Sequence, residues 1–166
     1  KDYIIISDGA VLGGASKTMD VDVSGDGIKE SFIIESDHPN GLKILGISGN
    51  HGQNFAYDFR GYDEFDEYND IKRGFYTQIT CYDLDGDGVK EILVSRGNKL
   101  VEMETLIYHP TSANIPDPFK LVARILGQEN MYIDGDHAII SPYGGQGLYS
   151  QYTYKNGQLY ELEKTN

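Results

Sequence analysis

The sequence predicts an all-β protein of antiparallel strands, with room for one or two short helices. Three observations support this class. The 166 residues include 20 glycines and 13 tyrosines, apolar runs alternate with Asp-Gly and Asn-Gly pairs, and one stretch recurs after 61 residues. Glycine favours turns, and tyrosine favours strands over helices. The length suits one domain, which we expect to span residues 1–166.

Short apolar segments between turn residues mark the expected strands in chain order. The first ends at Asp8-Gly9, and residues 42–48 form another after Asn40-Gly41. Residues 100–109 alternate apolar and polar side chains, which is typical of a strand with one buried face. Lys155-Asn156-Gly157 separates the last two strands and predicts a tight hairpin.

Two segments have helical features. Residues 63–73 form one of them. Residues 117–127 form the other, with Asp117 in an N-cap position and Gly127 in a C-cap position. The apolar spacing of this second segment also suits a strand, so the sequence leaves both structures open.

An internal repeat organises the chain. Residues 19–36, MDVDVSGDGIKESFIIES, align without gaps on CYDLDGDGVKEILVSRG, residues 81–97, at an offset of 61. We therefore expect two related units at about residues 15–75 and 76–127, followed by a degenerate β unit at residues 128–166. That last unit contains Asp134-Gly135-Asp136, which predicts a plain hairpin and could be a decayed copy.

The second copy crowds four carboxylates directly in front of an apolar run. Counted from Asp83, acids stand at positions 1, 3, 5 and 9, and glycine stands at position 6. Alternate side chains on a tight loop can converge on one hard cation, and glycine at position 6 allows the bend that offers the next carbonyl. The predicted Ca²⁺ ligands are Asp83, Asp85, Asp87, the Val89 carbonyl and Glu91. An EF-hand is excluded, because position 12 lies in a β-branched run.

The first copy predicts a second Ca²⁺ site with a weaker ligand set. Its candidate ligands are Asp22, Ser24, Asp26, the Ile28 carbonyl and Glu30. Ser24 takes the place of a carboxylate, so we expect the Asp83 loop to bind Ca²⁺ more tightly than the Asp22 loop.

These two loops resemble the FG-GAP/VCBS repeats, whose blades build the propellers of integrin alpha subunits and of many bacterial surface proteins. The family loop has the form D-x-D-x-D-G-x-x-D/E, which the Asp83 loop matches fully and the Asp22 loop matches except at Ser24. The resemblance implies blade-like repeats in a partial or degenerate propeller. It also implies a structural, adhesive or ligand-binding role.

Composition restricts the location and the partners. The net charge of −12 disfavours nucleic acid and anionic membranes. No apolar run approaches the roughly 18 residues that span a bilayer, and one cysteine excludes an internal disulfide. The chain begins with Lys1, so we expect that a signal segment has been removed and that the protein is secreted or held at the bacterial envelope.

The expected partner is a protein or a glycan at the cell surface. Tyrosines near the C-terminus form the candidate binding face, because aromatic rings stack on sugars and peptides; they are Tyr143, Tyr149, Tyr152 and Tyr154. Alternating tyrosines could equally pave a sheet. No residue is assigned a catalytic role. The alternative function is a carbohydrate-active protein, either a glycan-binding module or a hydrolase with paired acids.

Overall fold

The computed structural model describes most of the chain in ten stretches. The following account concerns residues 2–3, 16–22, 25–37, 41–48, 57–58, 76–98, 102–110, 119–127, 131–143 and 147–164. The segment 63–73, one of the two helix candidates, lies outside these stretches.

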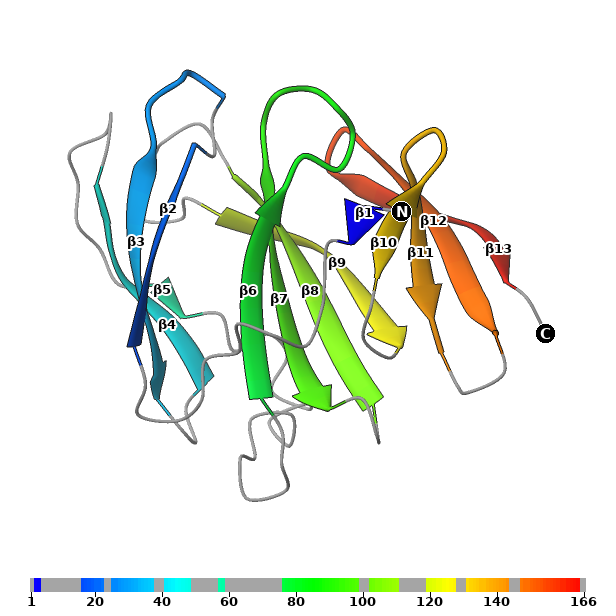
Figure 1. The fold of residues 1–166 in the computed structure, drawn as a ribbon, viewed down its shortest axis with the longest axis horizontal. Coiled ribbons are helices and arrows are strands. Elements are labelled where there is room, and N and C mark those ends of the chain that lie inside the picture. The colour runs from blue at the N-terminus through cyan, green and yellow to red at the C-terminus, as the bar shows by residue number, and fades with distance from the viewer. Residues whose placement is uncertain are drawn as a thin grey trace.

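The described residues form thirteen β-strands in three sheets (Figure 1). The first sheet has the order β2-β3-β4-β5, the second β6-β7-β8-β9 and the third β1-β10-β11-β12-β13. The strands are β1 (Asp2–Tyr3), β2 (Ser16–Val21), β3 (Glu30–Asp37), β4 (Gly41–Ser48), β5 (Tyr57–Asp58), β6 (Tyr76–Tyr82), β7 (Glu91–Asn98), β8 (Glu102–Pro110), β9 (Phe119–Gly127), β10 (Tyr132–Asp134), β11 (Ala138–Pro142), β12 (Tyr149–Lys155) and β13 (Gln158–Lys164).

Every neighbouring pair of strands is antiparallel, so the predicted all-β, antiparallel class is confirmed. The described stretches contain no helix. Residues 119–127, for which the sequence left helix and strand open, form β9 and pair with β8 from Phe119 to Gly127. The ladder with β8 decides the structure here, because the apolar pattern alone suits either state.

The strands of the first two sheets follow the spacing of the sequence repeat. β3 begins at Glu30 and β7 at Glu91, while β4 begins at Gly41 and β8 at Glu102, so both pairs start 61 residues apart. The acidic loops occupy equivalent places, between β2 and β3 and between β6 and β7. In Figure 1 these loops and the β10–β11 turn extend from the same end of the molecule.

The second sheet is buried on both faces. Ile92, Leu93 and Val94 follow one another along β7 and are all fully buried, although successive side chains of a strand point to opposite faces. Figure 1 places this sheet between the other two. A strand buried on both sides needs a continuous apolar run, which explains why Ile92–Val94 does not alternate with polar residues.

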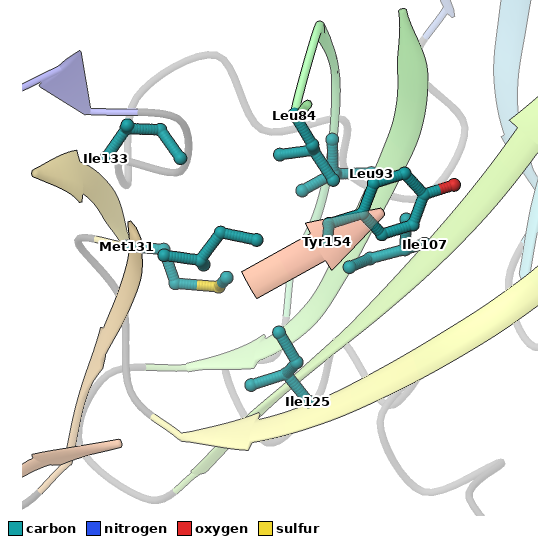
Figure 2. Packing of buried hydrophobic residues seen from close by; sticks show 8 residues of the cluster. Leu84, Leu93, Ile107, Ile125, Met131, Ile133 and Tyr154 are labelled. Atoms are coloured by element: carbon teal, nitrogen blue, oxygen red, sulfur yellow. The ribbon is translucent and has the colours of Figure 1, made fainter. Parts of the chain in front are cut away.

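The main apolar cluster joins the second sheet to the third (Figure 2). Its buried members come from both sheets and from the loop before β7: Leu84, Leu93, Ile107, Ile125, Met131, Ile133, Ile139 and Tyr154. Figure 2 shows the Tyr154 hydroxyl pointing away from Met131 and Ile133. This cluster holds one face of the acidic loop against the core.

The two hairpins predicted in the C-terminal part are confirmed. Lys155 pairs with Gln158, and both turn residues have positive φ, 52° at Asn156 and 75° at Gly157, as a type I′ turn requires. Asp134 pairs with Ala138 across a three-residue turn. The third sheet therefore has a short turn where the first two carry an acidic loop.

Candidate metal centre

The Asp83 carboxylate shapes its loop by accepting hydrogen bonds from backbone amides. Its Oδ1 accepts from the amides of Gly86 and Asp87 at 2.9 and 3.2 Å, and its Oδ2 accepts from the amide of Gly88 at 2.9 Å. Asp87 Oδ1 accepts from the Val89 amide at 2.8 Å. These contacts curl the chain around Asp83, as expected for aspartates that stabilise turns through nearby amides.

The first loop repeats this pattern 61 residues earlier. Asp22 accepts hydrogen bonds from the amides of Gly25 and Gly27 at 2.8 and 2.7 Å, and Asp26 accepts from the Ile28 amide at 2.9 Å. Each bond has its counterpart in the Asp83 loop. The two repeats therefore share backbone geometry as well as sequence.

Leu84 anchors the second loop to the protein interior. Its side chain has no exposed surface and belongs to the main apolar cluster. Its amide donates a 3.3 Å hydrogen bond to Oε1 of Glu91. Leu84 stands between Asp83 and Asp85, so a buried side chain at this position fixes the acids on either side of it.

Three acids of the loop converge on one point. Asp83, Asp85 and Glu91 each offer a carboxylate oxygen, and these oxygens lie within 4.8 Å of one another. Oδ1 of Asp85 is buried and has no hydrogen-bond partner in the described part of the chain. An unsatisfied buried oxygen is costly, and a cation bound among the three carboxylates would satisfy it.

Burial places the charges of this group at a disadvantage. It raises the pKa of Asp85, which the charge of Asp87 and a hydrogen bond with Asp87 raise further. It also raises the pKa of Glu91, against the opposing effect of hydrogen bonds from His109 and the Leu84 amide. A dication favours the ionised form of a nearby carboxylate, so it would reverse this disadvantage.

Glu91 is fully buried and has partners outside the loop. His109 Nδ1 lies 2.8 Å from its Oε2, and the Tyr154 hydroxyl lies 3.2 Å from the same nitrogen. Glu91 and His109 share a face because they follow the paired residues Leu93 and Ile107 by two positions along their strands. The sequence analysis missed both partners. The alternation in residues 100–109 contains the signal for His109, whereas no local pattern predicts a contact with Tyr154.

The other predicted ligands of the Asp83 loop stand apart from this group. The Asp87 side chain is exposed, and Val89 is half-buried. In the first loop Asp22 is half-buried, and Asp26 and Ile28 are exposed. Ser24 and the side chain of Glu30 lie outside the described residues, so the second Ca²⁺ site stays a prediction.

The four candidate tyrosines do not form one surface. Tyr143, Tyr149 and Tyr152 are half-buried, but only 1% of Tyr154 is exposed, so Tyr154 belongs to the core. The Tyr143 amide donates a 3.0 Å hydrogen bond to the Leu148 carbonyl. A binding face that uses the three outer tyrosines stays a prediction.

Comparisons with protein families, curated proteins and solved structures were made for the whole chain. They found no match. In the part of the chain that the structure describes, no helix is long and apolar enough to cross a membrane. The function of the loop must therefore be argued from its own chemistry.

The two acidic loops and the β10–β11 turn touch one another. A Cβ atom added to Gly25 would collide with the carbonyl oxygen of Gly88, and one added to Gly86 would lie 3.1 Å from Cε1 of His137. The backbones of the two acidic loops thus approach closely enough to exclude a side chain at Gly25.

This contact predicts a difference between two glycine substitutions. Gly25 and Gly27 have similar positive φ values, 81° and 86°, but a Cβ atom at Gly27 would meet nothing within 4 Å. Both Gly25→Ala and Gly27→Ala strain the backbone, and only the first adds a collision. We expect Gly25→Ala to lower the free energy of unfolding by about 1–3 kcal/mol more than Gly27→Ala. Urea denaturation measures this difference, and equal losses would contradict the contact between the loops.

Proposed function

We propose that this protein is a calcium-binding β module in which Ca²⁺ stabilises the Asp83 loop. The observation that carries the proposal is the convergence of Asp83, Asp85 and Glu91 around one point, together with the buried, unpartnered Oδ1 of Asp85. Three oxygens that surround one point suit a cation. A hydrolase would need two acids on opposite sides of a substrate.

Calcium suits this loop better than magnesium. Ca²⁺ accepts six to eight oxygen ligands in flexible arrangements, whereas Mg²⁺ requires a near-octahedral shell and retains its waters. Asp83, Asp85 and Glu91 would hold the ion, and carbonyl oxygens or water would complete its shell. The bound charge would offset the mutual repulsion of the acids beside the buried strand β7.

The role we propose is structural, at the cell surface or outside the cell. The repeated strands and loops support blade-like units in a partial propeller, and the net charge of −12 suits an environment where Ca²⁺ is abundant. Under this proposal the Asp22 loop is a second, weaker site. A protein or glycan partner would bind elsewhere on the module.

Calcium titration followed by thermal unfolding tests the proposal. We expect the melting temperature to rise with Ca²⁺, because a ligand that binds only the folded state stabilises it by about 2.7 kcal/mol at 100 times its dissociation constant. Asp85→Ala should remove most of this rise, since it deletes a ligand of the tighter site.

Asp136→Ala is the matched control. Asp136 is exposed in the adjacent β10–β11 turn, and its substitution changes the net charge by the same amount. This variant should respond to Ca²⁺ as the wild type does. A wild-type protein whose melting temperature does not change with Ca²⁺ would refute the proposed function.

A further inference from the structure

We propose that His109 and Tyr154 act as positioning residues for Glu91, so that a cation in the Asp83 loop strengthens the packing of β12 against the second sheet. This inference rests on the proposed function and adds a mechanical consequence to it. The loop, β8 and β12 belong to three separate parts of the sequence, and the Glu91 carboxylate is where they meet.

The carboxylate of Glu91 has two oxygens with different partners. Oε1 accepts a hydrogen bond from the Leu84 amide within the loop, and Oε2 lies 2.8 Å from His109 Nδ1 on β8. An ionised carboxylate can only accept hydrogen bonds, so Nδ1 must carry the proton and donate it. His109 therefore fixes the direction in which Glu91 faces the other acids.

Tyr154 brings the third sheet into the same network. Its ring is buried in the apolar cluster, while its hydroxyl lies 3.2 Å from His109 Nδ1. A hydrogen bond to Glu91, together with burial and the charges of Glu91 and Asp85, raises the pKa of this hydroxyl, so it stays protonated and acts as a donor. Figure 2 shows the hydroxyl leaving the apolar cluster on the side opposite Met131.

This network makes cation binding and sheet packing depend on each other. Partners that orient a metal ligand typically change metal affinity by about 10–100-fold when they are removed. Thermodynamic linkage requires the reverse effect as well. If the Tyr154 hydroxyl improves Ca²⁺ binding, then bound Ca²⁺ must stabilise the position of Tyr154 and of β12.

Calorimetric Ca²⁺ titration of four variants tests the inference. Tyr154→Phe removes only the hydroxyl, and His109→Ala removes the imidazole; each should weaken binding at the tighter site by about tenfold or more. His109→Asn keeps a nitrogen donor close to the position of Nδ1 and should recover part of the affinity. Tyr152→Phe is the control, because Tyr152 lies on the same strand and is half-buried.

Hydrogen exchange of the β12 amides gives a second readout. Ca²⁺ should slow exchange across residues 149–155 in the wild type and in Tyr152→Phe, and much less in Tyr154→Phe. A purely structural role of Tyr154 would change exchange equally with and without Ca²⁺.

The outcomes separate the two proposals. If the wild type binds Ca²⁺ and both Tyr154→Phe and His109→Ala bind it with unchanged affinity, the positioning role is refuted and the calcium site stands. If the wild type binds no Ca²⁺, both proposals fail.

Discussion

Glu91→Gln is expected to abolish strong calcium binding and, at the same time, to raise the melting temperature of the calcium-free protein. Glu91 is fully buried, and burial raises the pKa of its carboxyl. Without a cation its negative charge adds to that of Asp85, so a neutral amide of the same shape removes an unfavourable term. The amide keeps an oxygen that can accept from Leu84 or His109.

The effect on calcium has the opposite sign. A direct ligand is lost, so Ca²⁺ affinity should fall by more than the roughly 10–100-fold that accompanies loss of an orienting partner. Thermal unfolding in a chelator and in excess Ca²⁺ measures both effects. Glu161→Gln on the exposed strand β13 is the control and should leave both melting temperatures close to those of the wild type. A lower melting temperature for Glu91→Gln in chelator would contradict the predicted charge penalty.

Leu84→Ala should produce the largest loss of stability among the substitutions considered. Leu84 has no exposed surface, and its side chain packs in the cluster that joins the second and third sheets. Truncating a buried leucine to alanine removes apolar contacts and leaves a cavity, which costs about 2–5 kcal/mol. Because Leu84 also fixes the acids beside it, Ca²⁺ affinity should fall as well.

Leu162→Ala is the matched control, since Leu162 is 55% exposed on β13. A surface change of this kind should alter stability by no more than about 0.5 kcal/mol. Urea denaturation of both variants gives the comparison. Similar midpoints for Leu84→Ala and Leu162→Ala would mean that the loop is not anchored through Leu84.

The local features of this fold were readable from the sequence. Apolar alternation and turn residues predicted the strands and the Asn156-Gly157 hairpin, and the spacing of acids and glycines predicted two loops with the same turn structure. These signals depend on neighbours in the chain. Each side chain or turn residue carries its own conformational preference.

Contacts between distant segments were not readable. Residues 119–127 satisfied both a helical and an extended pattern until their ladder with β8 selected the strand. Tyr154 looked like part of a surface row of tyrosines, but it is buried and directed at His109. A strand carries no local mark of which sheet its alternate residues will face, so the network around Glu91 needed the structure.

The pairing of β1 with β10 has a consequence for the order of folding. Asp2 pairs with Ile133, so this ladder closes the widest loop among the paired strands. Adjacent hairpins close short loops and form quickly, whereas contacts between remote residues must first overcome a larger loss of chain entropy. During synthesis β1 has no partner until β10 has emerged, so its attachment should be among the last steps to complete the native state.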